Sequence, residues 1–121
     1  MLQNKRFQNM FKLSSRITVY VPSTIDVNKD FDNTEYVNKT HELLSTCFGG
    51  STETKAVGCW MSKKEGLVKE STTMVFSYCT ESALDENIDK VYEWCLQMQE
   101  ELAQESIAVE INGELYLLSN E

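Results

Sequence analysis

The alternation of apolar and polar residues predicts several strands separated by two amphipathic helices. β-Branched and aromatic residues are concentrated at 16–21, 54–62 and 67–79, as is typical of strands. Pro22 ends the first segment, because proline cannot donate to a strand ladder. Gly66 lies in the short connection between the second and third segments, so these two are predicted to form a hairpin. The third segment is apolar on both faces, which favours a central strand.

Two longer segments have helical spacing. The first begins at Thr34, with Asp32 as the expected N-cap residue, and ends before Gly49-Gly50, which suits a left-handed helix C-terminus. The second is predicted from about 82 to 104. Its apolar residues recur every three or four positions and form one stripe: Leu84, Ile88, Val91, Cys95, Met98 and Leu102.

The C-terminal segments 106–111 and 114–118 alternate as strands around Asn112-Gly113, a preferred type I′ turn pair. The resulting order is strand, helix, strand, strand, helix, strand, strand. This order predicts an α+β fold: a ferredoxin-like βαββαβ sandwich with an extra C-terminal strand. In this sandwich both helices cover one face of an antiparallel sheet. The uncovered face is an expected self-association surface.

A chain of 121 residues suits a single domain. We expect residues 1–15 to form a basic, mobile N-terminal arm, with a short amphipathic helix as the alternative. Residues 16–121 are expected to form the domain. No apolar run reaches the roughly 18 residues of a membrane-spanning helix. The sequence also lacks an apolar leader segment, so we expect a soluble cytoplasmic protein that does not bind membranes. Four cysteines without a CxxC pair are interpreted as reduced thiols rather than a zinc site.

The charge distribution changes the picture of the surface. The net charge is −8, but residues 1–16 hold four basic residues and no acidic one. The rest of the chain therefore carries seven basic and 19 acidic residues, a net charge of −12. Such a surface repels nucleic acid directly and favours a basic protein partner, such as the nucleic-acid-binding channel of another protein.

The predicted second helix concentrates this charge. The segment 81–105 holds eight acidic residues against Lys90 alone. Carboxylates at turn spacing lie about 5 Å apart and resemble the charge repeat of a nucleic-acid backbone. The predicted partner-binding residues on this helix face are Glu86, Asp89, Glu93 and Glu100.

Candidate catalytic residues are few. His41 is the single histidine, and its six-residue spacing from Cys47 places the two side chains on different helix faces. No GxSxG turn supports a serine hydrolase of the usual kind. Glu70 lies in an apolar-rich strand, where it would suit proton transfer or would pair with Lys55 across the hairpin. We therefore assign no catalytic residue, metal site or cofactor from the sequence.

Three motifs carry a resemblance: Phe48-Gly49-Gly50, Gly58-Cys59-Trp60, and the segment from Gly66 to Glu70. Over residues 16–118 the chain resembles a family of short bacterial, phage and plasmid proteins with an FGG…GxW…G…E pattern. The resemblance implies a ferredoxin-like fold. Because members of this family also occur on phages and plasmids, the resemblance implies, by association, an inhibitor of host defence. It brings no catalytic residue.

Two functions are expected from these features. The first is a non-enzymatic, homo-oligomeric acidic binding protein. Its expected role is to inhibit a nucleic-acid-handling host defence complex, in the manner of an anti-CRISPR protein. The alternative is a small ligand-binding domain or enzyme that uses the uncovered sheet face. The residues expected to line that face, as a pocket or a dimer surface, are Trp60, Glu70, Phe76 and Tyr78.

Overall fold

A computed structural model of the chain describes residues 2–25 and 29–120. The predicted polar loop at 23–32 includes residues 26–28, which lie outside the described residues. In chain order the elements are α1 (Lys5–Gln8), β1 (Ser15–Pro22), β2 (Thr24–Ile25), β3 (Lys29–Asp30), α2 (Thr34–Phe48), β4 (Thr52–Ser62), β5 (Gly66–Cys79), α3 (Glu81–Glu101), β6 (Ile107–Ile111) and β7 (Glu114–Leu118).

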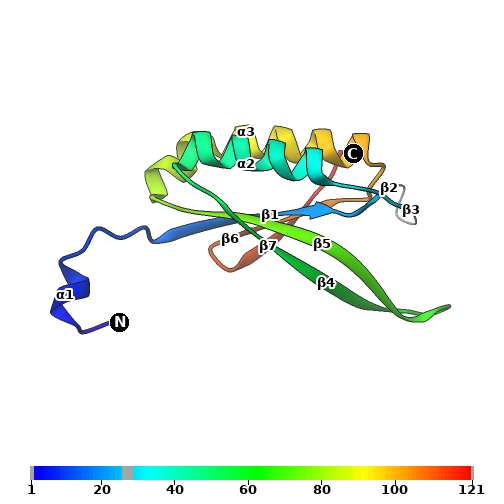
Figure 1. Cartoon of the computed structure of the whole chain (residues 1–121), viewed down its shortest axis with the longest axis horizontal. Coiled ribbons are helices and arrows are strands. Elements are labelled where there is room, and N and C mark those ends of the chain that lie inside the picture. The colour runs from blue at the N-terminus through cyan, green and yellow to red at the C-terminus, as the bar shows by residue number, and fades with distance from the viewer. Residues whose placement is uncertain (1, 26–28, 121) are drawn as a thin grey trace.

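Five strands form one antiparallel sheet in the order β4-β5-β1-β6-β7. Helices α2 and α3 lie side by side across one face of this sheet, and its other face has no helix over it (Figure 1). The predicted mixture of helices and strands, with an antiparallel sheet, is confirmed. Strand β5 lies between β4 and β1 rather than at an edge, as expected from its apolar character.

The core lies between the sheet and the two helices. Strand β1 is central, and its alternate residues Ile17, Val19 and Val21 are fully buried against the helices. Alternate strand residues point to opposite faces, so Thr18 and Tyr20 face the uncovered side. Burying one such aliphatic side chain contributes about 1.5–3 kcal/mol, which fixes the register of the strand.

The N-cap position of helix α2 lies one residue after the predicted Asp32. Its N-cap residue is Asn33, whose side chain donates to Pro22 O (3.2 Å) instead of capping the helix. Asp32 still accepts a hydrogen bond from the N–H of Thr34 (3.0 Å). The predicted C-terminus is confirmed: Gly49 has φ 96° and donates to Ser45 O (2.8 Å).

Helix α3 is shorter than predicted. The Thr80 side chain caps its N-terminus by accepting from the N–H of Ala83 (3.1 Å). The helix ends at Glu101 rather than at 104. Ala103 takes a left-handed conformation (φ 50°), and this turns the chain into the loop before β6. The apolar stripe is confirmed, since five of its six residues are buried and Ile88 packs half-buried against the core.

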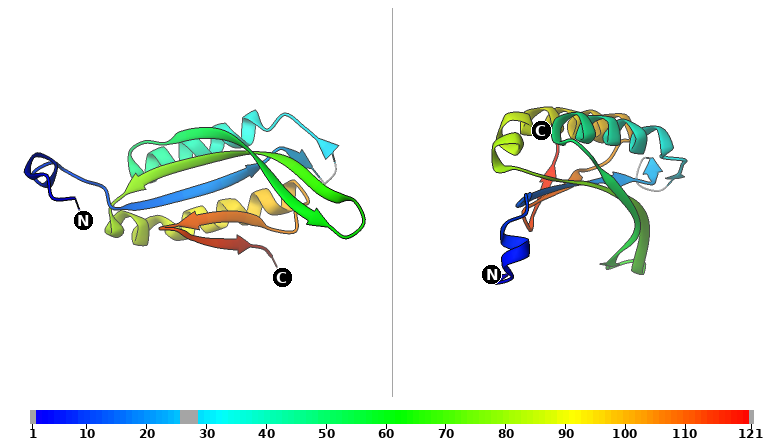
Figure 2. Two further views of the ribbon diagram at one scale, coloured as in Figure 1. Left: turned by 90° about the horizontal axis from the view of Figure 1, so that it is seen from below. Right: turned by 60° about the vertical axis from the view of Figure 1, so that its left-hand side comes forward.

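Two hairpins complete the sheet. Asn112 and Gly113 join β6 to β7 with φ values of 52° and 88°, which confirms the predicted type I′ turn. Strands β4 and β5 form a longer hairpin, whose distal end projects past the helices (Figure 2). Trp60 and Leu67 lie near this end and are more than half exposed.

The N-terminal segment extends away from the sheet (Figures 1 and 2). It contains a single helical turn, α1, within the segment for which the sequence favours a mobile arm over a short amphipathic helix. Asn4 caps this turn by accepting from the N–H of Arg6 (2.9 Å), and no residue of α1 is buried. Strand β1 begins at Ser15, one residue before the start of the predicted strand. Within the described ranges, no helix is long and apolar enough to cross a membrane.

Candidate functional site

Two adjoining hollows lie at one end of the sheet, on the face that α2 and α3 leave uncovered. The first encloses about 200 Å³ between the end of β1, the β4–β5 hairpin and the α3–β6 loop. The second encloses about 290 Å³ and is bordered by Trp60. Three residues line both hollows: Glu70, Gln104 and Ser106. A carboxylate, an amide and a hydroxyl therefore lie where the two hollows meet.

Glu70 is placed by its strand register. It lies directly opposite Gly58 in the β4–β5 ladder, and a Cβ atom built on Gly58 would be 3.8 Å from the Glu70 carbonyl oxygen. The absence of a side chain at Gly58 leaves space beside the half-buried Glu70. Glu70 is the one carboxylate among the residues that line the first hollow. The proposed pairing with Lys55 is wrong, because Lys55 lies opposite Thr73.

The far wall of the hollows is the loop between α3 and β6. The Gln104 amide nitrogen donates to Thr24 O (2.9 Å) and to Leu102 O (3.1 Å). The backbone carbonyl oxygen of Gln104 accepts a hydrogen bond from the side-chain amide of Gln99 (2.9 Å). These bonds fix the loop against the start of β2. Sequence analysis missed this wall because it placed Gln104 inside the second helix.

The four residues predicted for the sheet face divide into two pairs. Trp60 and Glu70 line the second hollow together, with the Trp60 side chain 51% exposed. Phe76 and Tyr78 instead line a separate hollow of about 520 Å³, bordered by the glycines after α2. Their rings meet edge to face, with centroids 6.1 Å apart. Strand β5 is long enough to carry the two pairs to different parts of the same face.

A buried carboxylate that the sequence analysis missed lies farther along this face. Glu110 accepts hydrogen bonds from Thr18 Oγ1 (2.8 Å) and Gly113 N (2.6 Å), and pairs with Arg16 Nη2 at 3.0 Å. Burial opposes ionisation of Glu110, but these hydrogen bonds and the Arg16 charge outweigh it and lower its pKa. Glu110 is thus an ionised clamp between β1 and the β6–β7 turn.

The predicted acidic face of α3 is present at the surface. The four carboxylates, Glu86, Asp89, Glu93 and Glu100, are all exposed. No ion pair to any of them is formed within the described part of the chain. They lie on the helix, away from the sheet-face hollows. The predicted binding face and the predicted pocket are therefore two separate surfaces.

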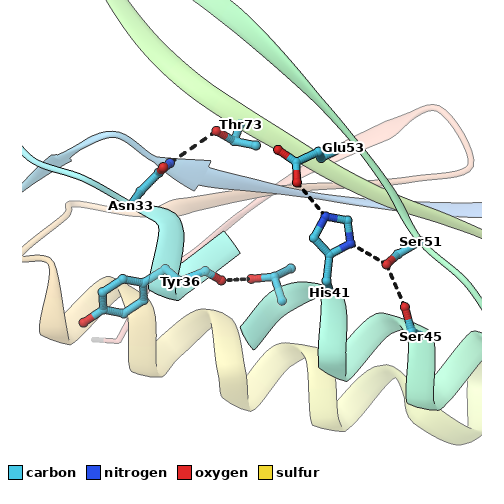
Figure 3. Close-up of polar contacts among 8 residues, drawn as sticks. Asn33, Tyr36, His41, Ser45, Ser51, Glu53 and Thr73 are labelled. Atoms are coloured by element: carbon cyan, nitrogen blue, oxygen red, sulfur yellow. Dashed lines mark hydrogen bonds and ion pairs between the residues drawn. The ribbon is translucent and has the colours of Figure 1, made fainter. Parts of the chain in front are cut away.

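Among the described residues, His41 forms no hydrogen bond to a cysteine and does not line the hollows around Glu70. Its ring lies between Ser51 and Glu53, which flank it from the start of β4 (Figure 3). All four cysteines are free thiols. Burial raises the pKa of Cys95 to about 12, so this thiol stays protonated at neutral pH. Among the described residues, no group of three or more His, Cys, Asp or Glu side chains is arranged to hold a metal ion.

No family model matches this sequence, and no curated protein matches it. The fold is similar to that of a phage SAM lyase in complex with S-methyl-5′-thioadenosine. That match has a TM-score of 0.64 and 14% identity, and covers 100% of this chain and 98% of that chain. The apo state of a phage SAM lyase gives a TM-score of 0.63 at 16% identity, covering 93% of this chain and 96% of that chain. These likenesses show a shared fold.

Proposed function

We propose that this chain is a lyase that acts on S-adenosylmethionine at the hollows around Glu70. The observation that carries the proposal is the position of Glu70, a carboxylate at the junction of two hollows and beside Trp60. The structural neighbours add support, because a SAM lyase has the same fold over nearly its whole length. This activity is a specific form of the second function expected from the sequence.

The charge of the proposed site suits this substrate. The sulfur of S-adenosylmethionine is a sulfonium cation, which a carboxylate and the face of an indole ring both attract. Glu70 and Trp60 supply these two groups in the same hollow. The net charge of −8 on the chain also raises the local concentration of a cationic ligand.

The reaction would break the bond between the sulfonium sulfur and the methionine carbon chain. The electron pair of that bond stays on sulfur, which leaves as the neutral thioether S-methyl-5′-thioadenosine. A carboxylate oxygen of the same substrate forms the new bond to the released carbon and closes a lactone, so no co-reactant is needed. The positive charge on sulfur disappears in this step. A partly enclosed site that excludes water therefore favours the neutral thioether over the sulfonium cation, which water would otherwise stabilise. Glu70 would orient the substrate through its charge, and Gln104 and Ser106 would offer polar contacts from the far wall.

Incubation of the purified protein with S-adenosylmethionine tests this function, with mass spectrometry to detect S-methyl-5′-thioadenosine. The Glu70→Gln variant keeps the size of the side chain and removes its charge, so we expect product formation to fall by about tenfold or more. Glu65→Gln is the matched control, because Glu65 is an exposed carboxylate in the turn of the same hairpin. Absence of product with the wild-type chain, or equal rates for Glu70→Gln and the wild type, would contradict the proposal.

Two further assignments belong to this proposal. The strand order β4-β5-β1-β6, with both helices on one face, supports a ferredoxin-like fold to which β7 is added. The four free cysteines support a reducing, cytoplasmic location. S-adenosylmethionine would be encountered there as a metabolite.

A second candidate function rests on the exposed carboxylates of α3. Their exposure, without ion pairs to other described residues, supports an acidic binding protein that occupies the basic nucleic-acid channel of a defence complex. A CRISPR nuclease assay tests it: the wild-type chain should inhibit DNA cleavage, and less so as salt increases. The combined variant of Glu86, Asp89, Glu93 and Glu100 to glutamine should lose inhibition, whereas Glu42→Gln on α2 should retain it.

A further inference from the structure

His41 belongs to a chain of hydrogen bonds that lies apart from the Glu70 hollows. Its Nδ1 is 2.6 Å from Ser51 Oγ, and its Nε2 is 2.9 Å from Glu53 Oε1. Ser45 Oγ is 2.8 Å from Ser51 Oγ and extends the chain (Figure 3). A hydroxyl, a base within hydrogen-bond reach and a carboxylate that orients the base form the arrangement used for nucleophilic catalysis.

The local fold explains how the three side chains meet. Helix α2 ends at Phe48, and the left-handed Gly49 reverses the chain, so that β4 starts beside the flank of the same helix. Residues two apart in an extended segment point to the same side. Ser51 and Glu53 therefore flank the imidazole of His41 from one direction, which sequence spacing along α2 could not indicate.

The chemistry of the partners fixes the expected tautomer. The Glu53 carboxylate only accepts hydrogen bonds, so the neutral ring carries its proton on Nε2 and donates it to Glu53. Nδ1 is then free to accept the proton of the Ser51 hydroxyl. Ser45 can donate its own hydroxyl proton to Ser51 Oγ. In this arrangement His41 is positioned as the general base for Ser51.

The cluster is accessible to solvent, and two backbone N–H groups lie on its loop. The side chains of His41 and Glu53 are 25% and 42% exposed. The backbone N–H groups of Gly50 and Ser51 donate to no acceptor within the described residues. Free backbone N–H groups on the loop of the nucleophile are the donors that stabilise an oxyanion in acyl transfer.

A largely apolar hollow borders the same loop. It encloses about 520 Å³ and is lined by Ser51, the two glycines after α2, and the aromatic side chains of Phe48, Phe76 and Tyr78. Thr52 lies opposite Phe76 and shares its face, whereas Ser51 and Glu53 point toward α2. An acyl chain attached at Ser51 would therefore have to pass around the edge of the Gly49-Gly50 loop to bury its carbons against these rings. The lining therefore favours a substrate with an apolar acyl group over a highly charged one.

We propose that Ser51, His41 and Glu53 form a second reactive site that hydrolyses esters of short apolar acyl groups. Ser51 Oγ attacks the acyl carbon while its proton moves to His41 Nδ1. The bond from the acyl carbon to the leaving oxygen breaks, and that oxygen takes the proton from His41. Water then attacks the acyl-serine in the same way and releases the carboxylic acid, so water is the sole co-reactant. Glu53 holds the imidazole in position throughout.

Labelling of the wild-type full chain with a fluorophosphonate probe tests the nucleophile directly, without any variant. Mass spectrometry of the digested protein should locate the adduct on Ser51. Hydrolysis of p-nitrophenyl butyrate should fall by about 10²-fold or more in Ser51→Ala and His41→Gln. Glu53→Gln should also slow hydrolysis and shift its pH profile, since the imidazole loses its orienting charge.

Thr46→Ala is the matched control, because Thr46 is an exposed hydroxyl residue on the same helix outside the cluster. It should label and hydrolyse like the wild type. Absence of an adduct on Ser51 in the folded wild-type chain, or an unchanged hydrolysis rate in Ser51→Ala, would overturn the proposal. Either result would show that the cluster only ties α2 to the start of β4. Neither result bears on S-adenosylmethionine cleavage.

Discussion

Glu70 and Gly58 lie directly opposite each other in the β4–β5 ladder, so the carboxylate of the proposed site faces a residue without a side chain. The nearest atom to a Cβ built on Gly58 is the Glu70 carbonyl oxygen at 3.8 Å, an ordinary contact distance. A side chain at position 58 would thus enter the hollow without a clash in the backbone. A substitution at position 58 can therefore change ligand binding without destabilising the hairpin.

The first prediction concerns a substitution of Gly58. Gly58→Val should fill part of the first hollow and raise the Kd for S-adenosylmethionine by about tenfold or more, which corresponds to ~1.4 kcal/mol. The thermal midpoint should stay unchanged or rise, because valine favours a strand more than glycine does. Calorimetric titration and thermal denaturation check the two parts.

Cys59→Val is the control for that variant, because Cys59 is the next residue of β4 and points to the opposite face. Its affinity for S-adenosylmethionine should equal that of the wild type. Equal affinity in Gly58→Val would show that ligand does not bind in the first hollow.

The second prediction concerns the Glu110 clamp. Since folding lowers the pKa of Glu110 below its usual value of 4.5, the ionised carboxylate stabilises the folded chain at neutral pH. This stability should be lost as pH falls from about 4.5 through the lower folded pKa. Glu110→Gln should reduce the free energy of unfolding at pH 7 by about 1–3 kcal/mol and should flatten the acid limb of the stability curve.

Urea denaturation at neutral and acidic pH measures this effect. Glu114→Gln serves as the control, because Glu114 is an exposed carboxylate on the same hairpin. A Glu110→Gln chain that matches the wild type at both pH values would show that the hydrogen bonds of Glu110 add no net stability.

The third prediction concerns the contact between α2 and α3. Tyr36 donates its hydroxyl to Glu101 Oε1 at 2.8 Å, and this bond, together with burial, raises the pKa of Tyr36 to about 12. The same bond lowers the pKa of Glu101. Glu101→Gln should therefore bring the pKa of Tyr36 closer to its ordinary value of 10.

NMR of ring-labelled tyrosine follows this titration at a single residue. Glu100→Gln, one position earlier on α3, should leave the pKa of Tyr36 nearly unchanged. If Glu101→Gln and Glu100→Gln shift it equally, a general charge effect rather than the hydrogen bond is responsible.

Sequence patterns predicted the elements whose signals are local. The apolar stripe of α3, the left-handed Gly49 and the Asn112-Gly113 turn depend on neighbouring residues alone, and all three are present. The end of α3 was predicted too late, because Gln104 and its neighbours are good helix formers. The hydrogen bonds from Gln104 to the start of β2 favour the loop instead, and they depend on residues far along the chain.

The candidate sites were predicted in part for the same reason. The sequence analysis grouped four residues on the uncovered face of the sheet. Glu70 and Trp60 border one hollow, but distance along β5 separates them from Phe76 and Tyr78. The contact of His41 with Ser51 requires a chain reversal that no helical spacing describes. It was missed although Gly49-Gly50, the signal for that reversal, was recognised.

The last prediction concerns self-association through the uncovered face of the sheet. Leu115 and Leu117 lie opposite Glu110 and Ala108 in the β6–β7 ladder and so share the face away from the helices. They are 59% and 65% exposed, which is unusual for neighbouring leucines unless another surface covers them. The solution mass from light scattering should be a multiple of 13.9 kDa, and the combined variant Leu115→Lys and Leu117→Lys should lower it. Tyr116→Lys, on the opposite face of β7, should keep the wild-type mass, and a wild-type mass of 13.9 kDa at all concentrations would contradict self-association.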